Sequence, residues 1–456
     1  MKKVDFENGR VGHNIAMVAI PMMAAQVLSL LYNIVDRIYI GRIPVTGKLE
    51  LGSIGLCFPV ITLILAFTNL YGAGGSPLFS MALGAGDKKK ADSILSTAFT
   101  LLVSTAVILT VIFEVVAEPM LYMFGASSDM MVYALPYLRI YLTGTVFAMI
   151  ATGMNPFINA QGYSSYGMRT VMIGAFLNIL LDPVFIFVLG MGVTGAAVAT
   201  VISQFFSAVF VIKFLTGSKA DFGISKNTLH KFRGGEAFRI TALGISSFVM
   251  QFTNSLVAVV CNNVLSTFGG DIYVSVYTVI SSVRQILDVP IGAISDGSSP
   301  VISFNYGAKR YDRLLKAIRL SIIAGTTYTF CMWIFILAFP HFLVHIFTSD
   351  KDIMPLAVSG LRLYFAAFVF QSLQYGGQSV FKSLGMNKKA IFFSLFRKVV
   401  LVVPLTMFLP YIVNPSVNGV YLAEPISNII GGMAAFTTMI LTVYIPCRRK
   451  VAQANK

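Results

Sequence analysis

The sequence predicts an all-α integral membrane protein with twelve transmembrane helices in two six-helix bundles. Three observations lead to this fold class. Of the 456 residues, 56% are hydrophobic and 12% are charged, and the mean hydropathy is +0.78. In a typical soluble protein, roughly a quarter of the residues are charged. The chain also contains twelve apolar segments that can each hold a spanning helix of about 20 residues, and its two halves repeat one another.

The twelve candidate spans are centred near residues 28, 66, 105, 143, 178, 205, 250, 288, 326, 367, 401 and 431. Their even number places both termini on the same side of the membrane. Most of the 34 Lys and Arg residues fall in loops on that side, which the positive-inside rule identifies as the cytoplasm. Arg397 and Lys398 are assigned to this basic side, whereas Arg139, Arg284 and Arg362 lie within spans. The net charge of +15 therefore reflects topology, and no nucleic-acid partner is expected.

The internal repeat divides the chain. SPLFSMALGA (76–85) returns as SPVISFNYGA (299–308), LRIY (138–141) as LRLY (361–364), and GAAVATVIS (195–203) as GVYLAEPIS (419–427), at spacings of 223 or 224 residues. We therefore predict an N-terminal six-helix bundle (1–216), a basic cytoplasmic linker (217–235) and a C-terminal six-helix bundle (236–456). Six spans per half orient both halves alike, so a pseudo-twofold axis along the membrane normal should relate them, with a binding site between them. This plan is typical of an alternating-access transporter.

Polar residues inside the spans of the N-terminal half predict a site for a cation or a proton. In the first span, PMMAAQVLSLLYNIVDRIYIG (21–41), Gln26, Ser29, Asn33 and Asp36 lie within an arc of about 80°. Pro21 predicts a bend there, because proline cannot donate a backbone hydrogen bond. An ionisable residue in a span is costly and usually marks a pathway. An alternative is that Asp36 lies at the outer interface and pairs with Arg37 or Arg42.

The fifth and sixth spans extend this prediction. Asn178 and Asp182 are one helical turn apart, and the sixth span adds Thr200. With Asp36 they supply side-chain oxygens for a proton or Na⁺, and the sequence does not select between the two ions.

The C-terminal half is not equivalent. Leu405 and Glu424 stand where the first half has Asp182 and Thr200. Arg284 and Asp288, one turn apart, are placed to neutralise one another, which leaves Asp296 as the better attractor for a cationic substrate. The polar residues expected to line a substrate cavity are Gln26, Asn33, Gln251, Asn254, Asp296, Gln371, Gln374 and Tyr375.

Other motifs are rejected. GMGVTG (190–195) matches a dinucleotide pattern but lies in a short loop between two spans, without the strand that the pattern requires. His341 with His345, and Glu114 with Glu118, lack a third ligand nearby in sequence, and the four cysteines show no metal spacing. We therefore expect no metal site, no cofactor and no catalytic chemistry.

The chain resembles the MATE (multidrug and toxic compound extrusion) family, and most of all its bacterial MepA-like or DinF-like branches. The resemblance rests on Pro21 and Asp36 in the first span, SMALGAGDKKKAD after the second, NILLDP in the fifth, GAAVATVIS in the sixth and SPVISFNYGAKRYDR after the eighth. It implies a secondary active transporter and not an enzyme, exporting cationic or aromatic small molecules in exchange for H⁺ or Na⁺.

The resemblance also assigns residues. Asp36, Asn178, Asp182 and Thr200 match the cation site of the family's N-terminal lobe. Some branches have a second acidic site in helices 7 and 10, where this chain has Gln251, Asn254, Gln371 and Gln374. The expected partners are small-molecule substrates and the lipid bilayer, and the expected form is a monomer in the cell (plasma) membrane. Two alternative functions are the export of one endogenous metabolite and the flipping of lipid-linked oligosaccharides.

Overall fold

The regular secondary structure in the part of the chain that the structure describes is helical. A computed structural model describes residues 3–44, 46–224, 228, 231–348 and 350–454, so the predicted linker 217–235 lies partly outside the described residues. No strand occurs among them, which confirms the predicted all-α fold. The chain forms two compact units. Unit 1 comprises Met1–Asp5 and Ala24–Gly244, and unit 2 comprises Phe6–Met23 and Ile245–Lys456.

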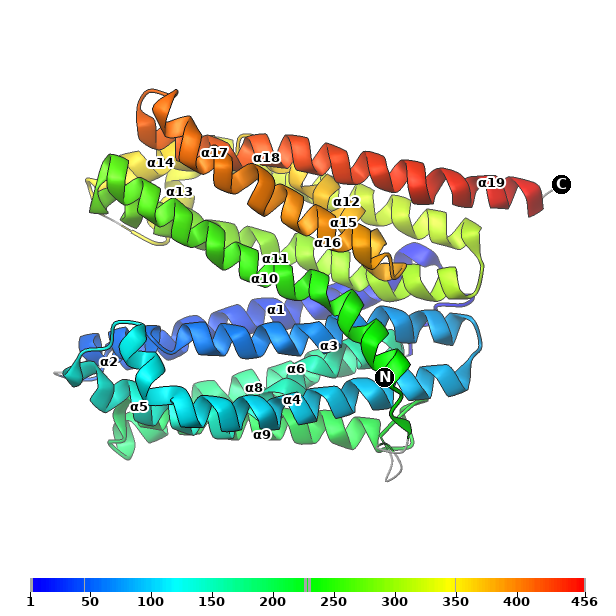
Figure 1. The fold of residues 1–456 in the computed structure, drawn as a ribbon, viewed down its shortest axis with the longest axis horizontal. Coiled ribbons are helices and arrows are strands. Elements are labelled where there is room, and N and C mark those ends of the chain that lie inside the picture. Colours follow the sequence, from blue (N-terminus) through cyan, green and yellow to red (C-terminus); the bar gives the residue numbers. More distant parts are fainter. Residues whose placement is uncertain (1–2, 45, 225–227, 229–230, 349, 455–456) are drawn as a thin grey trace. The chain divides into compact units, whose positions relative to one another are not determined.

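Unit 1 is built from the blue to green helices of Figure 1. They are most of α1 (Val11–Gly41), α2 (Gly47–Gly55), α3 (Phe58–Gly84), α4 (Lys88–Met123), α5 (Ser128–Thr143), α6 (Thr145–Gly153), α7 (Asn155–Ala160), α8 (Ser164–Pro183), the π-helix η1 (Val184–Val188), α9 (Gly192–Leu215) and the start of α10 (Gly234–Gly269).

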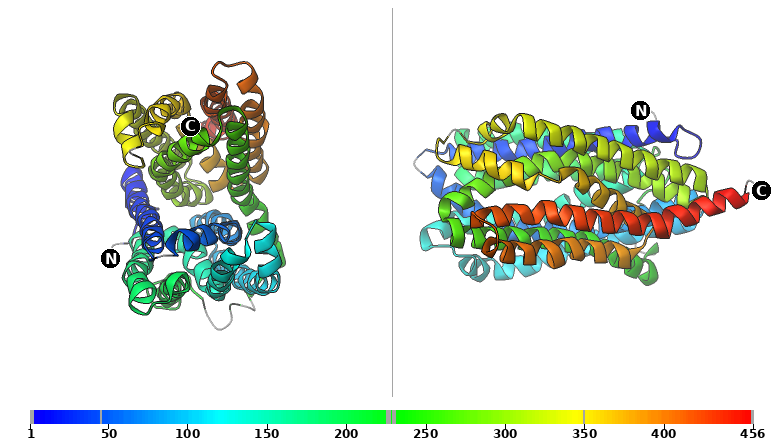
Figure 2. Two further views of the ribbon diagram at one scale, coloured as in Figure 1. Left: turned by 90° about the vertical axis from the view of Figure 1, so that its left-hand side faces the viewer. Right: turned by 90° about the horizontal axis from the view of Figure 1, so that it is seen from above.

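Unit 2 contains the first turns of α1, the rest of α10 and all later helices. These are α11 (Asp271–Gly307), α12 (Tyr311–Ala338), α13 (Pro340–His345), α14 (Ile353–Tyr364), α15 (Phe368–Ser383), α16 (Asn387–Leu395), η3 (Phe396–Val402), α17 (Val403–Phe408), η4 (Leu409–Tyr411), α18 (Ser416–Met439), η5 (Ile440–Tyr444) and α19 (Ile445–Ala454). The last three follow one another as a single rod to the C-terminus (Figure 2).

The helices agree with a multi-pass membrane protein. Within the described residues, nine helices are long and apolar enough to cross a bilayer, and two bent pairs raise this number to eleven. The remaining predicted span, centred near residue 288, corresponds to α11, which is 37 residues long and carries Arg284, Asp288 and Asp296.

The internal repeat is visible in where helices break. The fourth and tenth predicted spans are each two helices: α5 and α6 meet at an angle of 54°, and α14 and α15 at 50°. The first break falls at Gly144 and the second at Phe365–Ala367, about 223 residues later. Hydropathy alone predicted these segments as single spans, because it carries no information on direction.

Helix starts follow local rules. Asp87 precedes α4, and its side chain accepts the backbone N–H of Lys90 at 3.0 Å, which is an N-cap. The residue before it, Gly86, has a φ of 73° that suits glycine. In the second half the equivalent position is Lys309, which adopts a φ of 57° without glycine's freedom. The two halves therefore share the positive φ at this position, although the residue is glycine in the first half and lysine in the second.

The first helix of each half belongs to both units. Helix α1 continues unbroken through Pro21, and the division between units falls after Met23. Helix α10 changes from unit 1 to unit 2 after Gly244, which is 223 residues beyond Pro21. The bend predicted at Pro21 stays a prediction, but the proline stands next to the point where α1 passes from one unit to the other.

Glycines lie where the parts of α1 and α10 that cross between units pack against neighbouring helices. In unit 1, a Cβ added to Gly244 would lie 1.7 Å from the carbonyl oxygen of Leu70, and one added to Gly74 would lie 2.4 Å from that of Ile240. In unit 2, a Cβ on Gly297 would lie 2.6 Å from the Cα of Ala19. Gly74 and Gly297 are equivalent in the repeat. Close backbone approach of this kind is the usual basis of helix packing in membranes.

Replacing Gly244 should therefore destabilise unit 1. In Gly244→Ala the new methyl group has to displace α3 or α10, and we expect a loss of about 1–3 kcal/mol of stability, as for overpacked cores. The loss of stability is measured by thermal unfolding of the purified protein in detergent. Gly55→Ala is the matched control, because nothing lies within 4 Å of a Cβ at Gly55. Equal midpoints for the two variants would contradict this account of the α3–α10 contact.

Candidate functional site

Three of the four predicted ion-coupling residues of unit 1 meet at the end of α8. This helix ends at Pro183, which has no N–H to donate, and the chain continues as the π-helix η1. Single π-turns inside helices are frequent at functional sites. Asn178 and Asp182 lie on the face of α8 that turns inward, with exposed fractions of 3% and 0%.

The structure joins three of the four predicted residues by hydrogen bonds. The amide Nδ2 of Asn178 donates to Oδ1 of Asp182 at 3.1 Å and to Oγ1 of Thr200 on α9 at 3.3 Å. One amide thus holds two helices and a carboxylate in a fixed arrangement. The contact between Asn178 and Asp182 follows from their spacing of one turn, whereas the contact with Thr200 depends on the packing of α8 against α9.

Acceptor oxygens are in excess at this place. Oδ1 of Asp36, Oδ1 of Asn178 and Oδ2 of Asp182 are buried and have no hydrogen-bond partner among the described residues. Buried polar atoms are almost always paired, and a carboxylate out of water costs several kcal/mol unless its charge is compensated. A set of oxygens without donors is the arrangement that a proton or a metal cation would complete.

Asp36 belongs to the same electrostatic group. Its charge acts on Asp182, and both acids act on Tyr137 of α5. Tyr137 and Tyr141 are buried, and their rings stack with centroids 6.3 Å apart. Among the described residues, no ion pair within 4.0 Å joins Asp36 to Arg37 or Arg42, which was the alternative for this residue, although the charge of Arg37 also acts on Asp36. Arg37 instead lies over the ring of Phe58, 4.6 Å from its centroid.

The residues predicted to line a substrate cavity fall into two groups. Asn33, Asn254 and Asp296 are exposed, and Gln26, Gln251 and Tyr375 are half-buried. Gln371 and Gln374 are buried, and their amides are used inside unit 2: Gln371 donates to Asp288 at 2.7 Å and Gln374 to the carbonyl of Phe393 at 3.3 Å. A role in substrate binding stays a prediction for all eight.

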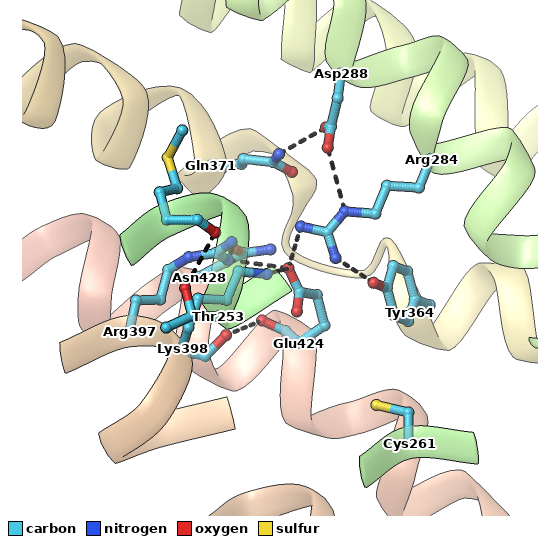
Figure 3. Close-up of polar contacts among 12 residues, drawn as sticks. Thr253, Cys261, Arg284, Asp288, Tyr364, Gln371, Arg397, Lys398, Glu424 and Asn428 are labelled. Atoms are coloured by element: carbon cyan, nitrogen blue, oxygen red, sulfur yellow. Dashed lines mark hydrogen bonds and ion pairs between the residues drawn. The ribbon is translucent and has the colours of Figure 1, made fainter. Parts of the chain in front are cut away.

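Unit 2 contains a second polar site, a buried cluster of charges shown in Figure 3. Three cations surround one carboxylate oxygen, Oε1 of Glu424 on α18. Nη2 of Arg284 lies 2.8 Å from it, Nη1 of Arg397 2.9 Å and Nζ of Lys398 3.8 Å. Arg397 also donates to Oδ1 of Asn428.

The cluster has a second carboxylate at its more open end. Nε of Arg284 lies 3.2 Å from Oδ2 of Asp288, which confirms the predicted contact one turn apart, and Arg284 also donates to the hydroxyl of Tyr364. The side chain of Asp288 is 25% exposed, whereas that of Glu424 is 4% exposed. We call Arg284, Asp288, Arg397, Lys398 and Glu424 the charge cluster.

Two of its members were wrongly placed by sequence. Arg397 and Lys398 were assigned to the basic cytoplasmic side, but both are buried within η3, inside the apolar stretch Asn387–Tyr411. Their position could have indicated burial, because Arg397 and Lys398 lie only four and three residues before the centre of the predicted eleventh span, near residue 401. Adjacent residues point in different directions on an α-helix, and the wider π-turn of η3 is where both turn toward Glu424.

Metal ligands do not gather elsewhere in the part of the chain that the structure describes. No group of three or more His, Cys, Asp or Glu side chains there could hold a metal ion. Glu114 lies 3.8 Å from Arg139 in a partly exposed pair.

Removing Glu424 should be far more damaging than removing a partly exposed acid. Glu424→Gln leaves three buried cations with one carboxylate, and breaking a buried pair typically costs about 3–5 kcal/mol. Glu114→Gln, which breaks the pair with Arg139, should cost less than about 1 kcal/mol. Thermal unfolding in detergent compares the two, and similar midpoints would show that Glu424 does not hold the cluster together.

Comparison with known proteins gives a consistent result. Two curated relatives are the Multidrug export protein MepA of Staphylococcus haemolyticus (strain JCSC1435), 26% identical over 402 residues, and its namesake of Staphylococcus aureus (strain MSSA476), 24% identical over 401 residues. Each alignment covers 87% of both chains. A crystal structure of MATE in complex with MaL6 shares the fold, with a TM-score of 0.90 and 24% identity over 99% of both chains. The MatE family model matches residues 21–184 and 246–408, one segment in each half of the repeat, and the chain belongs to the MatE family.

Proposed function

We propose that this protein is a secondary active transporter that exports cationic or aromatic small molecules in exchange for H⁺ or Na⁺. The observation that carries the proposal is the set of buried, unpartnered oxygens on Asp36, Asn178 and Asp182. Membership of the MatE family and the names of the staphylococcal relatives, which are multidrug export proteins, support the same function. The proposed cation-coupling residues are Asp36, Asn178, Asp182 and Thr200.

The chemistry of this site suits either ion. A proton bound to Asp36 or Asp182 would remove a buried negative charge and turn an acceptor into a donor. Na⁺ would take the same oxygens as ligands, as unwound or polar positions of transporter helices do. In both cases binding the ion reduces the cost of burying the acids, and this gain is the energy that can drive a change of conformation.

Helix α1 provides a route from ion binding to movement. Asp36 lies in the part of α1 that belongs to unit 1, whereas Pro21 lies in the part that belongs to unit 2. We propose that ion binding at Asp36 or Asp182 shifts α1 about Pro21 and releases substrate outside. The carrier then reopens inward and binds new substrate near Asp296, which is exposed, and near Gln371 and Gln374.

The remaining assignments are part of this proposal. We place both termini in the cytoplasm, because most of the Lys and Arg residues fall in loops on that side. We also propose that the protein is a monomer in the cell membrane. Export of one endogenous metabolite, or flipping of a lipid-linked oligosaccharide, would use the same fold. Transport of a panel of unrelated compounds distinguishes these functions.

Neutralising the two acids should stop coupled export. In Asp36→Asn and Asp182→Asn the side chain keeps its size but no longer gains a charge or a proton, so we expect the initial rate of ethidium efflux from proteoliposomes to fall at least about tenfold, equal to about 1.4 kcal/mol. Glu118→Gln, which changes an exposed acid of α4, is the matched control and should transport normally. Full, ion-dependent efflux in both aspartate variants would contradict the proposal. Imposing a pH gradient and an Na⁺ gradient separately identifies the coupling ion.

Asp296 should affect cationic substrates only. Asp296→Asn removes a negative charge from an exposed position of α11, and a loss of ~1 kcal/mol of attraction would raise the half-saturating concentration of a cationic dye about fivefold. Transport of an uncharged aromatic compound should not change. Identical transport of both compounds by the variant and the wild type would exclude Asp296 from substrate binding.

A further inference from the structure

The charge cluster of unit 2 is not electrically balanced. It contains three cations, Arg284, Arg397 and Lys398, and two carboxylates, Asp288 and Glu424. The neighbouring acid Asp296 forms no ion pair with any of these three cations among the residues that the structure describes. Arg362 on α14 is exposed and is not counted among the charges of the cluster. With all five groups ionised, one positive charge remains in a site whose inner members are less than a tenth exposed.

Lys398 is the member with unused bonding capacity. An ammonium group has three hydrogens to donate. Its one ion pair, with Glu424 at 3.8 Å, is longer than a hydrogen bond, and Lys398 Nζ donates to no acceptor within hydrogen-bond range in the described part of the chain. Its side chain is only 8% exposed. The two arginines, by contrast, are both bound to Glu424 at 2.8–2.9 Å.

We propose that unit 2 binds a small monovalent anion, a halide or a carboxylate, at Lys398 and Arg284. Such an anion would accept the free hydrogens of Lys398 and bring the net charge of the cluster to zero. Asp288 and Arg284 form the more exposed end of the cluster, at 25% and 17%, so an anion would enter from that end. Gln371 donates to Oδ1 of Asp288 at 2.7 Å, so one oxygen of this carboxylate already has a hydrogen-bond donor.

This site is separate from the proposed ion-coupling residues of unit 1. At the positions equivalent to Arg397 and Lys398, unit 1 has Gly174 and Ala175, so the excess of charge is a property of the second half alone. The inference concerns binding to the purified protein and does not depend on which compounds are exported.

The experiment compares anions at constant sodium concentration and ionic strength. Chloride, acetate and benzoate are each exchanged against MES, a bulky sulfonate, and thermal unfolding and the fluorescence of Trp333 are recorded. Trp333 is the single tryptophan of the chain, on α12 in unit 2. At about ten times the dissociation constant, a binding anion should raise the unfolding midpoint by roughly 2–4 °C. Tighter binding of benzoate than of chloride would identify the carboxylate of an organic compound, and the reverse would identify an inorganic ion.

Three variants make the test specific. Lys398→Gln removes the excess charge and should abolish the anion effect, while Arg362→Gln removes an exposed cation of the same unit and should leave it intact. Asp288→Asn raises the excess charge at the partly exposed end and should lower the dissociation constant severalfold. Absence of any anion effect in the wild type, or an equal effect in Lys398→Gln, would overturn the proposal and indicate that Lys398 is held as a neutral amine.

Discussion

The cost of holding a charge away from water governs both units of this protein. A buried ion is tolerated only where an opposite charge or several hydrogen bonds compensate it. Unit 1 gathers Asp36 and Asp182 with oxygens that lack donors, so it is short of positive charge. Unit 2 surrounds Glu424 with three cations, so it is short of negative charge. The same physical rule thus describes two buried polar groups whose uncompensated charge has opposite sign.

A common ancestry by duplication explains how the two sites can occupy comparable helices and differ in chemistry. Thr200 and Glu424 are equivalent, as are Gly174 and Arg397. A Cβ on Gly174 would lie 2.3 Å from Oγ of Ser207, so unit 1 has no room there for a long side chain, whereas Arg397 packs its methylene groups against Gly431. Small steric differences between the halves therefore decide which charges each half can hold.

Much of this could be predicted from sequence because it depends on local pattern. Hydropathy located the helices, the repeat spacing paired the halves, and one-turn spacings placed Asn178 beside Asp182 and Arg284 beside Asp288. What failed depends on direction and packing. The 54° and 50° breaks leave no mark in hydropathy, and the π-turn η3 buries Arg397 and Lys398 at positions where basic residues otherwise indicate a loop. Whether Gln371 and Gln374 face a cavity could not be read from their shared face, because their partners lie on other helices.

The exchange of first helices between the units also bears on how the protein is made. Unit 1 includes the start of α10 up to Gly244, which lies beyond the linker. During synthesis the first six predicted spans therefore enter the membrane before the segment that packs on Gly74 of α3 exists. Until about residue 244 has left the ribosome, that surface of α3 has no native partner. Unit 1 therefore completes its native contacts only after the start of the second half has been made.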